Sequence, residues 1–281
     1  MDLRTKLSII HSDGATETDY SREAQDFKRD TFAITLETTH FVYVGYKKPI
    51  NALYISMPTP NTIASSLTWE YYSESGWAPL DVSDETNGLT RDAFITWNRF
   101  IVDPSVTTNP AEIAIAGETK YWVRFAPNDN LSAITFQAIN LLFSDDNDMS
   151  QEVPALVDAC FYPAGQTSHV VQHAASKNYI ISRLRQLGYI KYTADGLEEN
   201  IDQWDILDIY EIKQASTYHT ISQIYFNLSD SLDDQYWVKY KEYGDKFESA
   251  LKLGQLRIDN NDDGEVDSSE KRPIKTIRWG R

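Results

Sequence analysis

The sequence predicts an α+β protein in two domains, with an antiparallel β-sandwich or jelly roll followed by a three-helix bundle. Strand-length segments fill residues 32–143, helical spacing fills residues 168–253, and a polar, acidic segment from Ser144 to Pro154 separates them. A chain of 281 residues is long enough for two domains. We expect a β-sandwich domain over 1–148, whose residues 1–30 form an extended arm, and a helical domain over 149–281.

The first part of the chain contains short runs rich in β-branched and aromatic residues, separated by turn residues, which is typical of strands. In the run KYWVRFAP, Tyr121, Val123 and Phe125 are expected on one face, and Trp122 and Arg124 on the other. Many short strands at this spacing favour a sandwich or jelly roll. The predicted strands are 32–37, 40–46, 52–57, 67–73, 94–100, 112–117, 120–127 and 133–143.

The second part has apolar residues at helical spacing. We expect a helix over Ser168–Gly188, with Gly188 as its C-terminal cap, and two further helices over 204–228 and 229–253. Ser231 and Asp234 have the spacing of a capping pair at the start of the last helix. An EF-hand-like loop and a short C-terminal strand complete the predicted helical domain.

Composition excludes several classes of function. The net charge of −16 argues against binding of nucleic acid or an anionic membrane by the surface as a whole. The single cysteine excludes an intrachain disulfide framework. The N-terminal residues lack the apolar core of a signal peptide, and no segment approaches the ~18 apolar residues of a membrane span. The sequence therefore predicts a soluble protein without an export signal.

The segment DNNDDGEVDSSE, from Asp259 to Glu270, has the layout of a calcium loop. Gly264 stands where the loop turns sharply, and Val266 is placed to pack inward. A sensor is not expected, because no second loop is found and Pro273 shortens any exit helix. We predict a structural Ca²⁺ clip; the alternative is an acidic turn without metal. The predicted ligands are Asp259, Asn261, Asp263, the Glu265 carbonyl, Asp267 and Glu270.

The last residues, KRPIKTIRWGR, form a short basic tail in an otherwise acidic chain. Such a tail can bind an acidic neighbour or add a strand to the edge of its sheet. The predicted partner-binding residues are Lys271, Arg272, Lys275, Arg278, Trp279 and Arg281.

No catalytic signature is found, and we predict that the chain is not an enzyme. There is no phosphate-binding glycine loop. His169 and His173 have the spacing of two metal ligands on a helix but lack a third ligand, so they are interpreted as two polar residues on one helix face. Cys160 is interpreted as a small buried residue.

Aromatic residues of the first part raise the alternative of a sugar-stacking platform. Because strand periodicity divides these aromatics between two faces, Trp69 and Trp77 at least are interpreted as packing residues. The residues considered for the platform are Trp69, Tyr71, Tyr72, Trp77 and Trp97.

Residues 67–100 and 120–127 resemble a β module that recurs in structural proteins of tailed bacteriophages. The module has a W-x-Y strand, a G-W turn, an L-x-V-x-D-x-T segment, a glycine turn and a Y-W-x-R-F strand. Asn98 and Arg99 depart from it, because proline often ends that strand. The matching residues are Trp69, Tyr71, Gly76, Trp77, Leu80, Val82, Asp84, Thr86, Gly88, Trp97, Tyr121, Trp122, Arg124 and Phe125.

Residues 199–253, with the calcium-type loop and the T-I-R segment after it, resemble head–tail adaptor (neck or connector) proteins of the same viruses. The resemblance implies a virion protein, assembled in the host cytoplasm, that forms a homo-oligomeric ring, with a dodecamer as the stoichiometry considered. Its partners would be the portal protein and other neck or tail proteins, and DNA would pass through its channel without specific binding. The alternatives are a baseplate or tail-fibre-base component and a calcium-clipped carbohydrate-binding module.

Overall fold

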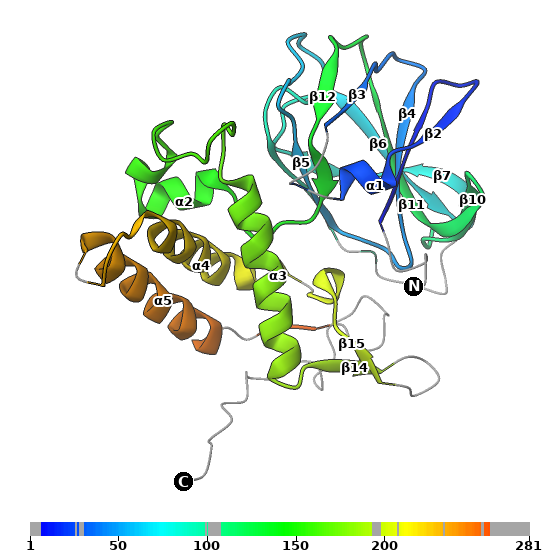
Figure 1. Cartoon of the computed structure of the whole chain (residues 1–281). Helices are drawn as coiled ribbons and strands as arrows, with labels where there is room; N and C mark the ends of the chain where they lie inside the picture. Colours follow the sequence, from blue (N-terminus) through cyan, green and yellow to red (C-terminus); the bar gives the residue numbers. More distant parts are fainter. Residues whose placement is uncertain are drawn as a thin grey trace. The chain divides into compact units, whose positions relative to one another are not determined.

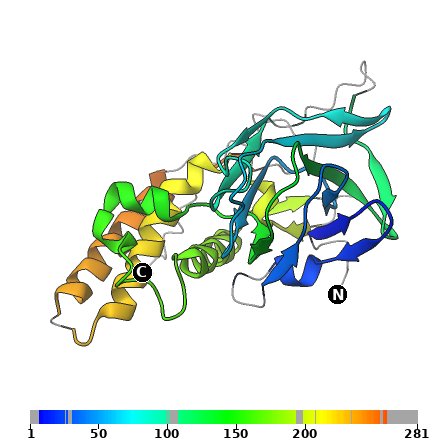
Figure 2. The same ribbon diagram turned by 90° about the horizontal axis from the view of Figure 1, so that it is seen from above.

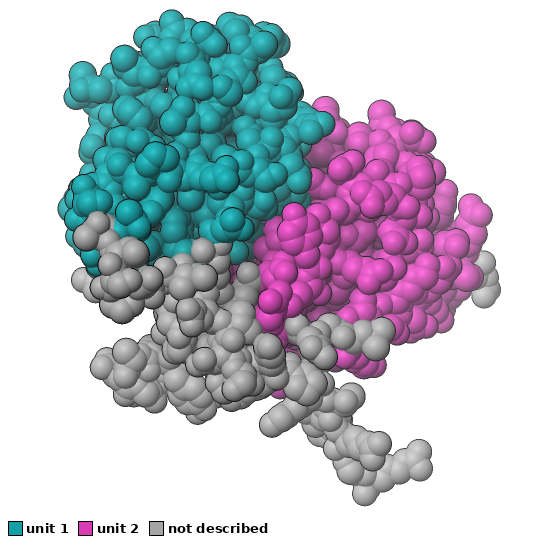
Figure 3. All heavy atoms as spheres, turned by 180° about the vertical axis from the view of Figure 1, so that it is seen from behind, with its two compact units in different colours: residues 1–141 teal, residues 142–281 magenta. Residues whose placement is uncertain are grey.

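The structure, a computed structural model, describes residues 7–25, 27, 31–98, 100, 108–192, 198–206, 208–232, 234–253 and 256–258. It is an α+β structure with antiparallel sheets. The chain divides into two compact units, unit 1 over 1–141 and unit 2 over 142–281, which Figure 3 shows in different colours.

Unit 1 is built from antiparallel strands with one short helix, α1 (Ser21–Ala24). One sheet has the order β2-β1-β4-β11-β6-β7, with β10 on β11; a second has the order β13-β5-β9-β8; and β12 pairs with β3 (Figure 1). The strands are β1 (Ser8–Ser12), β2 (Glu17–Asp19), β3 (Phe32–Ile34), β4 (Phe41–Tyr46), β5 (Ala52–Ser56), β6 (Leu67–Ser73), β7 (Gly76–Pro79), β8 (Val82–Asp84), β9 (Ala93–Trp97), β10 (Glu112–Ile115), β11 (Glu118–Pro127), β12 (Ile134–Phe136) and β13 (Ala138–Asn140).

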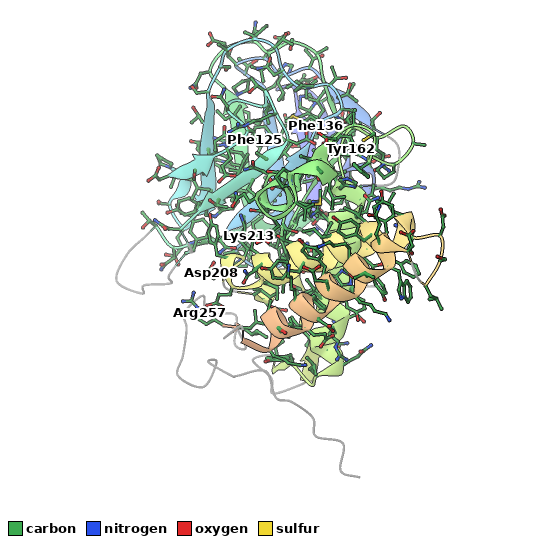
Figure 4. All side chains as sticks on the ribbon, turned by 90° about the vertical axis from the view of Figure 1, so that its left-hand side faces the viewer. Phe125, Phe136, Tyr162, Asp208, Lys213 and Arg257 are labelled. Atoms are coloured by element: carbon green, nitrogen blue, oxygen red, sulfur yellow. The ribbon has the colours of Figure 1, made fainter. Side chains whose placement is uncertain are left out.

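The central strand β11 confirms the alternation predicted for KYWVRFAP. Val123 lies opposite Val44 on β4, and Phe125 packs against Trp69 with ring centroids 4.7 Å apart. Arg124 points to the other face, where its guanidinium pairs with Glu70 at 2.6 Å. Phe125 and Phe136 of unit 1, both fully buried, are labelled in Figure 4.

The prediction that residues 1–30 form an extended N-terminal arm is wrong for the part of this segment that the structure describes. Ser8–Ser12 form β1, which pairs along its whole length with β4, and Glu17–Asp19 form β2. Ile9 and Ile10 are both buried, although they point to opposite faces of the sheet. The segment is therefore part of the sheet, and burial of two adjacent isoleucines explains why it pairs rather than extends into solvent.

Unit 2 contains the three predicted helices, α3 (Val170–Gln186), α4 (Tyr210–Leu228) and α5 (Gln235–Leu253). Figures 1 and 2 both show α4 and α5 side by side, as an antiparallel hairpin joined by residues 229–234. The other elements are α2 (Asp146–Glu152), the 3-10 helices η2 (Pro154–Val157) and η3 (Gln203–Asp205), and the paired strands β14 (Ile190–Tyr192) and β15 (Glu198–Asn200).

The acidic segment after Ser144, predicted as a polar break, begins with helix α2 instead. Asp145 and Asp148 form a capping box, in which each carboxylate accepts a hydrogen bond from the other residue's backbone N–H, at 3.0 and 3.2 Å. Lys213 of α4 pairs with Asp148 at 3.0 Å. The acidic residues start a helix and attach it to α4, because carboxylates satisfy the free N–H groups of a first helical turn.

The core of unit 2 lies where α2, η2, α4 and α5 meet. Its buried members include Met149 of α2, Leu156 of η2, Ile221 of α4 and Tyr243 of α5. Half-buried aromatic side chains surround this cluster, namely Phe161, Tyr218, Tyr236 and Tyr240. The α4–α5 hairpin is therefore held along one side by apolar packing, which gives it a fixed shape.

Candidate functional site

A serine, a histidine and an aspartate lie in hydrogen-bond contact in unit 2. Ser144 Oγ is 2.9 Å from Nδ1 of His173, and Nε2 of His173 is 3.2 Å from Oδ1 of Asp146. The order of these groups is that of a nucleophile, a base and an orienting acid. Sequence reasoning missed this arrangement, because Ser144 and His173 are distant in sequence and no local motif marks them.

Further hydroxyl groups enclose this chain of hydrogen bonds. Ser144 Oγ also lies 2.8 Å from Ser216 Oγ of α4, and Thr220 Oγ1 of α4 lies 3.4 Å from His173 Nδ1. Asp146 accepts hydrogen bonds from the backbone N–H of His169 at the start of α3, at 3.1 Å. The arrangement thus connects the start of unit 2 with α3 and α4.

The Ser144–His173–Asp146 arrangement is buried, which decides what it can do. Ser144 is 0% and His173 1% exposed. A nucleophile must be reached by its substrate, and this hydroxyl is covered by protein on every side. The arrangement therefore satisfies polar groups inside unit 2 and fixes the positions of its helices, which supports a structural role.

The two predicted histidines and the cysteine do not form a site together. His169 and His173, interpreted as two polar residues on one helix face, are both buried, and Nε2 of His169 donates to the Leu156 carbonyl at 2.9 Å. In the part of the chain that the structure describes, no group of three His, Cys, Asp or Glu side chains is placed to hold a metal ion. Cys160 is exposed, so its interpretation as a buried residue was wrong.

The aromatic residues considered as a sugar platform do not form one surface. Trp69 and Trp97 lie in the core of unit 1, with ring centroids 6.1 Å apart. Tyr72 and Trp77 face the opposite side of the sheet and contact each other at 5.5 Å. A cation of the chain already lies over Trp77, because the Arg124 guanidinium is 4.1 Å from its ring centroid.

The end of the α4–α5 hairpin carries a cluster of aromatic side chains, of which Phe226 is exposed and Trp237 and Tyr240 are half-buried. Phe226 in the last turn of α4 contacts Tyr240 and Trp237 of α5, with ring centroids 5.2 and 6.3 Å apart. Trp237 and Tyr240 contact each other at 5.0 Å. Leu232 lies in the connection between the helices, and Val238 in the first turn of α5. We call these five residues the aromatic end.

Three apolar side chains of the aromatic end are exposed. Phe226, Leu232 and Val238 are 47%, 69% and 60% exposed. Apolar side chains that gather in one exposed place on a soluble protein mark interaction surfaces. Trp and Tyr are also the residues that contribute most energy to protein interfaces. Because four of these five side chains come from two packed helices, most of the surface is preformed and loses little conformational entropy on binding.

Charges next to the aromatic end have both signs. The carboxylate of Asp234 accepts from the Tyr236 backbone N–H at 2.9 Å and so caps α5, whereas Ser231, its predicted capping partner, contributes a backbone carbonyl. Asp230 is exposed, and its carboxylate has no ion pair within the described residues. The Lys241 ammonium lies 5.4 Å from the Trp237 ring centroid, so this ring already attracts a cation.

The opposite end of the hairpin holds the chain just before the calcium-type loop. Ile258 forms a bridge with Ile206, and Arg257 pairs with Asp208 at 2.9 Å and with Glu211, at the start of α4, at 2.5 Å. Figure 4 labels Asp208 and Arg257 beside each other. The predicted calcium ligands in 259–270 and the predicted partner-binding residues in 271–281 lie outside the described residues.

Comparison with known proteins assigns no family to this chain. No model of a known protein family matches it, and no curated protein matches it. Among the described helices, none is long and apolar enough to cross a membrane.

Proposed function

We propose that the chain is a structural head–tail adaptor of a tailed bacteriophage, which forms a ring between portal and tail. The observation that carries this proposal is the aromatic end of the α4–α5 hairpin, a preformed apolar surface on a rigid element. The resemblance of residues 199–253 to phage adaptors supports the same function. In this proposal, unit 1 is a jelly-roll domain that serves as a scaffold, and unit 2 is an independent assembly domain.

The electrostatics of the chain suit a channel through which DNA passes. A net charge of −16 repels the phosphate backbone, so DNA slides past without adhering. The buried Ser144–His173–Asp146 arrangement also fits a structural protein, because it links elements of unit 2 and is closed to a substrate.

Native mass spectrometry of the purified chain tests whether the aromatic end is an assembly surface. The double variant Phe226→Ser/Val238→Ser removes two exposed apolar side chains from this surface. A matched control, Tyr210→Ser/Ile63→Ser, removes two exposed apolar side chains elsewhere. We expect multimers from the wild type and the control, and mostly monomers from the first variant, because interface energy concentrates in such anchors. Equal multimers in all three would contradict the proposal.

A further inference from the structure

The aromatic end is an apolar surface that no described element of the chain covers, and the chemistry around it restricts what can bind. An exposed aspartate, Asp230, flanks it, and its aromatic rings offer faces on which a cation can lie, as the chain's own Lys241 ammonium does 5.4 Å from the Trp237 ring centroid. A partner segment that fits would carry both basic side chains and an apolar anchor. Arginine suits such a place better than lysine does, because its planar guanidinium stacks on aromatic faces.

One segment of this chain has that chemistry. Residues 271–281 contain five of the 26 Lys and Arg residues and none of the 42 Asp and Glu residues, and they carry Ile274, Ile277 and Trp279. Arg278 and Trp279 are adjacent in the sequence, so the segment presents a cation next to an aromatic anchor. The segment is complementary in charge to Asp230 and in apolar character to Phe226 and its neighbours.

The place where the described chain ends favours a neighbouring copy over the same copy. Arg257 is tied to Asp208 and Glu211 at the start of α4, whereas Phe226 lies in its last turn. The distance from Glu211 to Phe226 is about 22 Å along the helix, at ~1.5 Å per residue. The same copy's segment would have to turn back along its own hairpin. The residues between 258 and 271 span up to about 43 Å when extended, which is long enough to reach a neighbouring copy.

We propose that residues 271–281 of one copy dock on the aromatic end of the next copy. Trp279 inserts beside Phe226 and Tyr240, and Arg278 lies over Trp237 near Asp230. Such a contact is head-to-tail, so repetition closes a ring when the rotation per copy allows it. This inference rests on the proposed function, which places copies of the chain side by side. It adds that residues 271–281 are what binds the aromatic end.

Two full-length variants test this contact by complementation. The variant Arg278→Ser/Trp279→Ser keeps the aromatic end and loses the docking segment; Phe226→Ser/Val238→Ser keeps the segment and loses the end. Each alone should associate at least about tenfold more weakly than the wild type, because aromatic and arginine anchors dominate interfaces. In a mixture of the two variants, the segment of one can dock on the aromatic end of the other. This pair has no further intact surface, so assembly ends at the heterodimer. Sedimentation velocity, with one variant ¹⁵N-labelled for native mass spectrometry, should show one-to-one heterodimers.

A synthetic peptide of residues 271–281 provides an independent measurement. It should bind Arg278→Ser/Trp279→Ser and dissociate wild-type multimers, while a peptide of the same residues in scrambled order should do neither. If Arg278→Ser/Trp279→Ser assembles like the wild type while Phe226→Ser/Val238→Ser stays monomeric, the segment is not the occupant, and this inference fails while the proposed function stands. If both variants assemble normally, the proposed function fails as well. A mixture without heterodimers likewise overturns the inference.

Discussion

His219 lies where three helices of unit 2 meet. Its ring stacks on Tyr179 of α3 at 4.3 Å, contacts Phe247 of α5 at 4.9 Å, and places Nδ1 3.1 Å from Ser176 Oγ. Burial disfavours the charged ring and lowers the pKa of His219 from 6.5 to about 4. Among the residues that the structure describes, no carboxylate offsets this burial, so protonation of His219 works against the folded state.

We therefore predict that acid destabilises unit 2 through His219. The unfolded state takes up this proton below pH 6.5, but the folded state does so only near pH 4. Stability is thus fully present above pH 6.5 and falls as pH drops towards 4, by on the order of 3 kcal/mol. Urea unfolding followed by helical circular dichroism should show this loss, and His219→Gln should reduce it. Parallel pH profiles for wild type and His219→Gln would contradict the prediction, and His40→Gln in unit 1 is the control.

Lys177 of α3 is buried and has no ion pair or hydrogen bond within the described residues. Burial lowers the pKa of Lys177 from 10.5 to about 7. Near neutral pH, the lysine must therefore either lose its proton on folding or be buried as a charged ammonium, and both reduce the stability of the folded state. We predict that Lys177→Met raises the free energy of unfolding at pH 7 by roughly 3 kcal/mol. The gain should shrink as pH rises from 7 to 10.5, where the unfolded lysine also loses its proton.

Denaturant titrations at pH 7 and 9 check the Lys177 prediction. Lys252→Met, at an exposed site on α5, should change stability little at either pH. Loss of stability in Lys177→Met at pH 7 would show that the buried ammonium has a favourable partner.

Side-chain positions within strands could be predicted from the sequence, but buried polar contacts could not. The alternation in Tyr121–Phe125 follows from a period of two residues and needs no tertiary information. The inward position of Ser216 and Thr220 depends on partners from other elements, such as Ser144 and His173, that one sequence does not reveal.

At the scale of elements, the start of α2 offers a direct test. Asp145→Ala removes the cap that accepts the Asp148 N–H at 3.0 Å. We expect a cost of about 1 kcal/mol, confined to the first part of unit 2. Hydrogen exchange followed by mass spectrometry should show faster exchange in 146–152, whereas Asp158→Ala, at an exposed site, should leave it unchanged. Unchanged protection in Asp145→Ala would show that packing alone holds α2.

Which elements could be predicted depends on how local their causes are. Helices α3, α4 and α5 have clear apolar periodicity, and most strands have a typical composition. Strand β1 was missed because its role depends on pairing with β4. Helix α2 was missed because its acidic residues resemble a linker until their capping contacts are seen. The aromatic end was missed because sequence alone does not show which aromatics of a helix stay exposed.

At the scale of the whole molecule, the loop 259–270 is predicted to bind Ca²⁺ through Asp259, Asp263 and Glu270. Six oxygen donors at the spacing of a calcium loop are present in the sequence. We expect weak binding, on the order of 10⁻⁴–10⁻³ M, because no second loop supports it. Isothermal calorimetry should detect uptake by the wild type and none by Asp263→Ala/Glu270→Ala. No uptake by the wild type at millimolar calcium would leave the loop as an acidic turn.

The central claim is that this chain joins portal to tail as a ring. The most direct measurement is electron microscopy of the purified chain mixed with a portal protein of a tailed bacteriophage. We predict rings of the chain stacked coaxially on the portal, and their loss in Phe226→Ser/Val238→Ser, whose aromatic end is disrupted. Portals that stay bare when mixed with the wild-type chain, or rings that persist unchanged in this variant, would contradict the account.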